Sequence, residues 1–367
     1  MAKIGIYAGD ANDPISNVKA SLPQWTRYLS GIGHDVDLFG AALPFDGSDS
    51  QCTQLKHTGG GTSAVDKVLY AYRTCVNYCI EYDPDVLIQF WRYPVHAPAV
   101  VGAGHRTGVS AVLRYNGDVF RQHRGFSGVT KYLVQAFNTP SKIAPRFADA
   151  VVAFGEYGES ELVRRGVSQD DIYILPPSGD VGEQFLPPRD KSTVKKRLGL
   201  PIDKTLALYV GRIETVKGMD YLRETISQVA AQDQIQFVLV GGGPGRSDHS
   251  THEDVDIFDD DTVRIEGKIS HDEIHKYYQA GDVYVHPSPY EGIPLTILEA
   301  LQCGLPVVAR SAGDIHLAVP NIVNGPTEMA QMLLQETWQS GWRNRRPFTK
   351  EYQRAALNQI ISDVTRS

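Results

Sequence analysis

The sequence predicts an α/β protein made of two doubly wound, Rossmann-like domains in series. Its 367 residues exceed one ordinary core, because single hydrophobic cores stop growing near ~250–300 residues. Short apolar runs alternate with helix-like stretches along most of the chain, which is typical of βαβ units and parallel sheets. A stretch rich in Pro, Gly and charge, residues 176–192, interrupts this alternation and is predicted to be the interdomain linker.

Apolar runs predict six strands in the first domain, which we place at residues 1–180. They lie at residues 4–8, 36–39, 86–90, 111–115, 150–154 and 172–175. A helix is predicted to begin near Ser21, with Pro23 in its first turn, and to stop at residues 31–33, which include two glycines.

The second domain is predicted at residues 181–345. Its strands are expected at residues 205–210, 236–240, 263–266, 283–285 and 306–309, and residues 349–367 are expected to form a final helix. Ligands of such sheets bind beyond the carboxyl ends of the strands. Two such domains facing each other would form a deep cleft.

Composition excludes several classes of protein. The net charge of −7 argues against a nucleic-acid binder, which would usually be basic. No apolar stretch approaches ~18 residues, so we expect no membrane span. The first nine residues are predicted to be a strand and not a signal peptide. Four cysteines without a CxxC motif fit a reducing compartment, so a cytoplasmic protein is expected.

The most informative segment is HPSPYEGIPLTILEALQCGLPVVA, residues 286–309. A predicted strand ends in Pro-Ser-Pro, which forces a turn, and a helix follows from about Pro294 to Cys303. The N–H groups of Leu295 and Thr296 have no intrahelical partner at this helix start. Together with the positive end of the helix dipole, they suit a phosphate group.

Two glutamates flank this helix start at a spacing of eight residues. Glu291 precedes the helix and Glu299 lies one turn inside it. If a nucleotide-sugar placed its diphosphate on the helix start, its sugar would meet Glu291 and its ribose Glu299. The alternative is a pair of exposed glutamates beside an ordinary helix.

Two further segments carry candidate phosphate ligands. In LALYVGRIETVKGMDY, Arg212 follows a predicted strand and Gly211, and Lys217 stands five residues later. Two cations at the carboxyl end of a buried strand suit a diphosphate, although they could also be ordinary surface cations. In FVLVGGGPGR, a turn that includes Gly242 allows close backbone approach, but its glycine spacing does not fit a dinucleotide-binding motif.

These three segments, in this order, resemble family 4 of the retaining glycosyltransferases, which have the two-domain GT-B fold. The resemblance is strongest over residues 206–309. It implies that Arg212 and Lys217 hold the diphosphate, that Glu291 meets the sugar and that Glu299 binds ribose. It also implies that the final helix, residues 346–367, packs back on the first domain. The donor-binding residues implied are Gly211, Arg212, Lys217, Gly242, Lys268, Ile269, Glu291, Gly292, Ile293, Leu295, Thr296 and Glu299, with Glu291, Arg212 and Lys217 assigned to catalysis.

The first domain fits the family pattern less well. The family often has a Gly-Gly loop after the first strand, where this chain has Gly-Asp-Ala-Asn from Gly9. A family histidine that contacts the donor sugar is replaced by Asn116, whose amide can still bind a hydroxyl. We predict that Asp10, Asn116 and Asp118 lie on the acceptor and sugar side.

The function predicted is retaining transfer of a sugar from a nucleotide-diphosphate sugar to a hydroxyl acceptor, which could be a glycan, a lipid-linked compound or a small molecule. No cofactor or metal is expected, because no DxD-type motif stands near this site; the acidic loop at residues 249–261 is the rival cation site. A non-catalytic sugar-nucleotide-binding or scaffold protein of the same fold is the alternative, and a phosphorylase or an epimerase could also use this fold. Basic clusters at residues 195–197 and 343–346 allow peripheral membrane contact.

Overall fold

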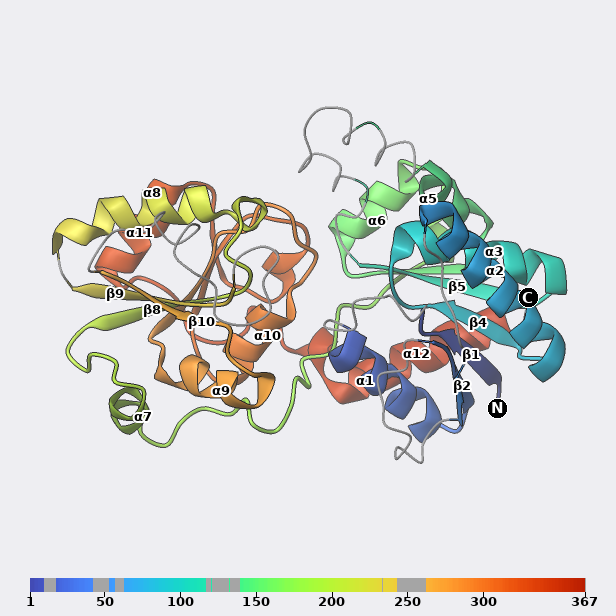
Figure 1. Cartoon of the computed structure of the whole chain (residues 1–367), viewed down its shortest axis with the longest axis horizontal. Coiled ribbons are helices and arrows are strands. Elements are labelled where there is room, and N and C mark those ends of the chain that lie inside the picture. The colour runs from blue at the N-terminus through green and yellow to red at the C-terminus, as the bar shows by residue number, and fades with distance from the viewer. Residues whose placement is uncertain are drawn as a thin grey trace. The chain divides into compact units, whose positions relative to one another are not determined.

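The computed structural model describes residues 1–9, 18–41, 53–56, 63–116, 120, 132, 139–232, 234–242 and 262–366. The chain divides into two compact units, Met1–Ser178 with Arg346–Ser367, and Gly179–Arg345. Each unit is built on its own parallel sheet (Figure 1). The predicted α/β class, with two doubly wound parallel sheets, is therefore confirmed.

The first unit holds a seven-stranded sheet in the order β3-β2-β1-β4-β5-β6-β7. The strand order reverses between β1 and β4, which pair in parallel with Ile4 beside Val86. Its strands are β1 Lys3–Tyr7, β2 Asp35–Gly40, β3 Thr53–Lys56, β4 Val86–Gln89, β5 Ser110–Tyr115, β6 Ala150–Ala153 and β7 Ile172–Ile174.

Helices cover both faces of this sheet (Figure 1). They are α1 Val18–Gly31, α2 Ala64–Tyr82, α3 Tyr93–Thr107, α5 Thr139–Ile143, α6 Glu156–Val163 and α12 Lys350–Val364. α1 and α12 share one core, where Trp25 and Leu29 pack with Leu357 and Ile360. The final helix is thus part of the first unit, and Gln353 of α12 donates a hydrogen bond to the Pro176 carbonyl.

The prediction for α1 was wrong at its start. The helix begins at Val18, so Pro23 lies inside it and not in its first turn. A proline there removes one intrahelical N–H donor. One turn after Pro23, the Thr26 hydroxyl and the Arg27 guanidinium both donate hydrogen bonds to the Pro23 carbonyl.

The second unit holds a six-stranded sheet in the order β10-β9-β8-β11-β12-β13. Its order reverses between β8 and β11, where Tyr284 lies beside Leu208. The strands are β8 Thr205–Val210, β9 Ile235–Val240, β10 Val263–Gly267, β11 Val283–His286, β12 Val307–Arg310 and β13 Asn321–Val323, and the helices are α7 Lys191–Arg197, α8 Met219–Val229, α9 His271–Ala280, α10 Leu295–Gln302 and α11 Pro326–Gln335. α8 and α11 pack together on one face, and α9 and α10 lie on the other (Figure 1).

Short 3-10 helices complete the described secondary structure, at Ala144–Phe147, Gln169–Asp171, Thr215–Lys217, Ala230–Gln232, Ile315–Leu317 and Arg346–Phe348. Among the helices that the structure describes, none is long and apolar enough to cross a bilayer.

Two lysines of α7 form ion pairs with Asp282, a partly buried residue directly before β11. The two oxygens of Asp282 lie 2.9 Å from Lys191 Nζ and 2.6 Å from Lys195 Nζ, and the Leu206 N–H also donates to this carboxylate. Burial opposes ionisation of Asp282, but these donors outweigh it and hold its pKa below the usual value. Lys195 is buried, so the basic cluster noted at residues 195–197 is not a continuous cationic surface.

Candidate functional site

The candidate site lies where the strand order of the second sheet reverses. Ligands of open parallel sheets bind outside the carboxyl ends of the strands at such a point. Here the neighbouring strands β8 and β11 end at Val210 and His286. The two segments with the strongest sequence signals, residues 206–221 and 286–309, contain these two strand ends.

Glycines bring the loops after β8, β9 and β10 into contact. Gly241 has φ 154°, and a Cβ at this position would lie 1.7 Å from the Gly211 carbonyl oxygen. The Gly211 N–H donates a 2.9 Å hydrogen bond to the Val240 carbonyl, and the Gly241 N–H donates a 2.8 Å hydrogen bond to the Gly267 carbonyl. Among the described residues, a Cβ on Gly242 would meet no atom within 4 Å. The rest of the predicted glycine turn, from residue 243, lies outside the described residues.

Lys217 and Glu291 form an ion pair across the two principal loops. Lys217 Nζ lies 2.5 Å from Glu291 Oε1, and the side chains are 26% and 16% exposed. A Cβ on Gly218, whose φ is 81°, would lie 2.2 Å from the Pro287 carbonyl oxygen, so the turns after β8 and β11 pack closely. The structure thus joins two of the three residues predicted to be catalytic.

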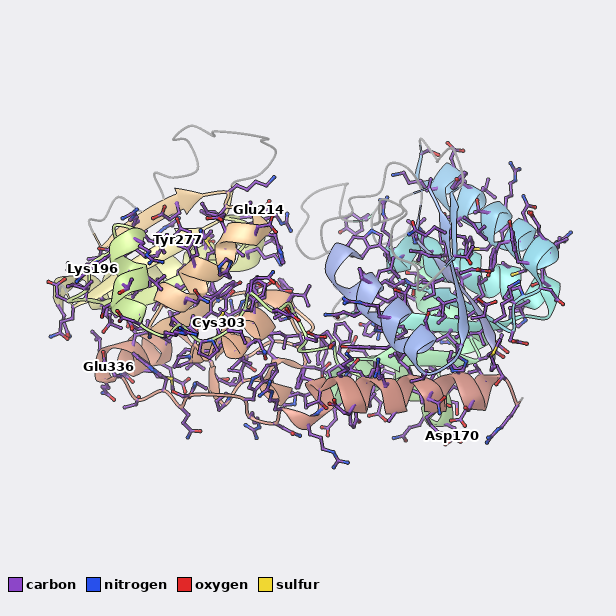
Figure 2. All side chains as sticks on the ribbon, turned by 90° about the horizontal axis from the view of Figure 1, so that it is seen from below. Asp170, Lys196, Glu214, Tyr277, Cys303 and Glu336 are labelled. Carbon is purple, nitrogen blue, oxygen red and sulfur yellow. The ribbon has the colours of Figure 1, made fainter. Side chains whose placement is uncertain are left out.

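Arg212 stands in the same loop but has a different partner. Its side chain is 63% exposed, and its guanidinium lies 2.6 Å from Glu214 Oε2. Glu214, labelled in Figure 2, was not singled out from the sequence, although it stands only two positions away. The Tyr209 hydroxyl donates to the Arg212 carbonyl at 2.8 Å and fixes the loop backbone.

The start of α10 differs by one residue from the prediction. Pro294 is the N-cap, with extended backbone at φ −70° and ψ 143°, and the helix begins at Leu295. The N–H groups of Leu295 and Thr296 therefore belong to the first turn, where an α-helix provides them no intrahelical acceptor. Gly292 and Ile293, which precede the cap, are buried.

A glycine from a distant loop supports the backbone of Glu291. Gly313, after β12, has φ 44°, and a Cβ there would lie 2.0 Å from the Glu291 carbonyl oxygen. A larger residue would displace the turn that carries Glu291. Sequence reasoning missed this residue, because its relevance depends on a contact across the sheet.

Glu299 is a buried carboxylate with two neighbours on α9. Its side chain is 9% exposed, its Oε1 lies 3.5 Å from His271 Nε2, and its Oε2 accepts a 2.7 Å hydrogen bond from the Tyr278 hydroxyl. The hydrogen bond with Glu299 raises the pKa of His271, and burial opposes that shift. Glu291 and Glu299 are both mostly covered, so the alternative of two exposed glutamates is wrong.

The remaining predicted residues are scattered. Lys268 is exposed and Ile269 half-buried, directly after β10. Asn116 belongs to the first unit, where its amide donates to the Phe90 carbonyl at 3.4 Å, and its Oδ1 is buried without a hydrogen-bond partner among the described residues. Asp10, Asp118 and the acidic loop at 249–261 lie outside the described residues. Within the described ranges, no group of three or more His, Cys, Asp or Glu side chains could hold a metal ion.

The site therefore offers cations and free N–H groups beside two carboxylates. Lys217, Arg212 and the α10 start can bind anionic oxygens. Glu291 and Glu299 can accept hydrogen bonds from hydroxyl groups. A ligand that combines phosphate groups with sugar hydroxyls fits this chemistry.

Comparison with known proteins agrees with this geometry. Residues 204–335 match the family model described as glycosyl transferases group 1. A D-inositol 3-phosphate glycosyltransferase of Xylanimonas cellulosilytica is 31% identical over 189 residues, which are 48% of this chain and 44% of that protein. The chain thus spans less than half the length of this relative.

Solved structures extend the likeness to the fold of the whole chain. Sucrose-phosphate synthase from Thermosynechococcus elongatus aligns with a TM-score of 0.69 and 20% identity, covering 100% of this chain and 97% of that one. HepE of Anabaena, solved in complex with UDP-glucose, aligns with a TM-score of 0.64 and 17% identity. The alignment covers 100% of this chain and 98% of HepE. The fold that the sequence resemblance implied is thereby confirmed: the chain has the two-domain GT-B fold, and its residues 204–335 match the model of group 1 glycosyl transferases.

Proposed function

We propose that this protein is a retaining glycosyltransferase, which moves a sugar from a nucleotide-diphosphate sugar to a hydroxyl acceptor. The Lys217–Glu291 pair carries the proposal, because it joins a phosphate-binding cation to a sugar-binding carboxylate at the β8/β11 switch point. The group 1 domain and the fold shared with HepE, solved in complex with UDP-glucose, support a nucleotide-sugar donor.

In this proposal the diphosphate lies on the start of α10. The N–H groups of Leu295 and Thr296, with Lys217 and Arg212, bind its oxygens. The nucleoside diphosphate gains negative charge as the sugar departs, and these fixed positive groups stabilise that charge in the transition state. We propose that no metal is required for this step, since the protein supplies the positive charge itself.

The two glutamates act on different parts of the donor. Glu299, held by Tyr278, accepts hydrogen bonds from the ribose hydroxyls. Glu291 holds the donor sugar and stabilises the positive charge that develops on it, without forming a covalent bond. The acceptor hydroxyl must also be held close to the sugar, and this positioning contributes much of the rate. Asn116, Asp10 and Asp118 remain predictions for that side.

The acceptor in this proposal is a glycan, a lipid-linked compound or a small molecule that carries a hydroxyl. Peripheral membrane contact would use Arg343, Arg345 and Arg346, which are exposed. Sedimentation with vesicles containing anionic lipid tests this part: binding that disappears when the three arginines become glutamine supports it. Equal binding of the variant, or no binding by the parent, opposes it.

A donor panel tests the proposed function directly. The protein is incubated with UDP-, GDP-, ADP- and TDP-sugars and a mixture of hydroxyl acceptors, and nucleoside diphosphate release is measured. Release from one donor class, with product that keeps the anomeric configuration of the donor, is expected. A protein that binds a nucleotide-sugar but never releases the diphosphate would instead be the non-catalytic binder of the same fold.

A further inference from the structure

His286 is a buried polar residue at the centre of the site that no step described above uses. It is the last residue of β11, lies beside Ala309 of β12, and is 4% exposed. Within the described part of the chain, neither of its ring nitrogens has a hydrogen-bond partner. Buried polar atoms are nearly always paired, so each exception needs an explanation.

The surroundings of His286 bring it near the Lys217–Glu291 pair, since the charges of both residues act on its imidazole. The next residue, Pro287, carries the carbonyl that packs on Gly218, directly after Lys217. The imidazole stacks on Tyr284, with ring centroids 6.2 Å apart, and the Tyr284 hydroxyl reaches the Val210 carbonyl at the end of β8. The ring therefore lies on the Tyr284 side of β11, level with the loops that carry the ion pair.

The imidazole is neutral near neutral pH. Burial lowers the pKa of His286 to about 4, while the negative charge of Glu291 raises it and the positive charge of Lys217 lowers it. A neutral imidazole has one N–H donor and one acceptor nitrogen. The Ser288 hydroxyl, 1% exposed in the same turn, also lacks a partner among the described residues, so two unpaired polar groups share this turn.

Donor binding creates a need for one more hydrogen-bond donor at this place. Lys217 is paired with Glu291, but the proposed function assigns it to the diphosphate. A diphosphate carries more negative charge than one carboxylate and draws the ammonium group away. Glu291, which is 16% exposed, would then lose its partner in a largely dry environment, which is costly for a charged group.

We propose that His286 is a positioning residue, whose ring N–H donates a hydrogen bond to the Glu291 carboxylate in the donor-bound protein and holds it against the donor sugar. This proposal rests on the proposed function. The proposal explains why the buried His286 ring has no hydrogen-bond partner among the described residues. Its N–H is needed only when Lys217 leaves Glu291. The proposal also predicts that His286 affects the transfer step more than the binding of the free nucleotide, because the diphosphate alone also draws Lys217 away from Glu291.

The test compares His286→Phe, which keeps a ring but removes both nitrogens, with His286→Gln, which keeps an N–H donor. In His286→Phe, kcat is expected to fall roughly 10- to 100-fold, as for loss of a hydrogen bond to a charged group. Affinity for free nucleoside diphosphate, measured by calorimetry, should fall by a smaller factor than kcat, at most about 5-fold. His286→Gln should recover at least about half of the loss on a logarithmic scale. Should the Phe variant not fold, His286→Met against His286→Gln gives the same comparison between side chains of similar length.

Several outcomes would overturn the proposal. Parent-like kcat in the apolar variant shows that the nitrogens are not used. A Gln variant no faster than the apolar one removes the N–H donor from the explanation, and parallel losses of kcat and nucleotide affinity indicate a purely structural role. If the parent turns over no nucleotide-sugar, the proposed function fails and this proposal fails with it. Parent turnover with an unaffected His286→Phe overturns this proposal alone.

Discussion

Replacing Glu291 with glutamine is expected to tighten binding of the free nucleoside diphosphate while it slows sugar transfer. Lys217 Nζ lies 2.5 Å from Glu291 Oε1, so this pair must open before Lys217 can reach a diphosphate. Glu291→Gln removes the competing charge and leaves a side chain of almost the same shape. Lys217 is then available to the ligand at a smaller cost.

The size of this effect follows from the exposure of the pair. The side chains are 26% and 16% exposed, between a surface pair and a buried one. Exposed pairs contribute ~0.2–1 kcal/mol. Because this pair is partly buried, we take the upper part of that range, about 0.5–1 kcal/mol, as the cost of opening it. Without this cost, the free nucleoside diphosphate should bind about 2- to 5-fold more tightly to the Glu291→Gln variant.

A double-mutant cycle by calorimetry checks this explanation. Lys217→Met should weaken diphosphate binding by roughly 10-fold or more, because a hydrogen bond to a charged group is worth ~1.5–3 kcal/mol. In the Lys217→Met background, Glu291→Gln should bring no gain, since no ammonium group remains to be released. An equal gain in both backgrounds, or weaker binding to Glu291→Gln itself, would refute competition through the ion pair.

Four other predictions follow from the described contacts. Arg212→Ala should weaken diphosphate binding less than Lys217→Met does, because the Arg212 side chain is 63% exposed. Equal losses in titrations would contradict this. Asp282→Asn should lower the free energy of unfolding in urea by about 2–3 kcal/mol, because it leaves Lys195 buried without its counter-ion. The control is Asp220→Asn, which removes an exposed pair with Arg223 and should change the free energy of unfolding little. The folded-state pKa of His271 is raised, so its pairing with Glu299 stabilises the protein below the unfolded pKa and is lost as pH rises through the folded value. His271→Gln should therefore lower Tm more at about pH 5.5 than at about pH 8.5, and an equal loss at both would exclude the charge interaction. Sugar transfer should survive dialysis against EDTA; restoration of lost activity by Mg²⁺ or Mn²⁺ would show that a metal is needed.

The central strands and the edge strands β7 and β10 could be predicted from the sequence, but the edge strands β3 and β13 could not. β8 was predicted with its observed bounds, because a parallel strand covered on both faces is a continuous apolar run. β3 and β13, which were missed, are edge strands with the sequences TQLK and NIV. β13 depends on the Asn321 amide, which donates to the carbonyls of Val307 and Gln339, and no local pattern reveals such contacts.

The candidate site shows the same division between local and long-range information. Glu291, Glu299, Arg212 and Lys217 could be found because each stands at a strand end or a helix start that the local pattern defines. Their partners come from other elements: Tyr278 and His271 of α9 contact Glu299, and Gly313 supports Glu291. These partners required the three-dimensional structure, because their spacing along the chain carries no motif.

The most direct test of the proposed site is a pair of titrations, with free nucleoside diphosphate and with intact donor, combined with initial rates on the parent, Glu291→Gln and Glu299→Gln. Glu299→Gln should weaken the binding of both ligands alike, because both contain the ribose. Glu291→Gln should bind the free nucleotide at least as well as the parent and yet turn over the donor much more slowly, because its partner is the sugar, where charge develops in the transition state. A Glu291→Gln protein that turns over the donor at the parent rate would contradict the assignment of this site.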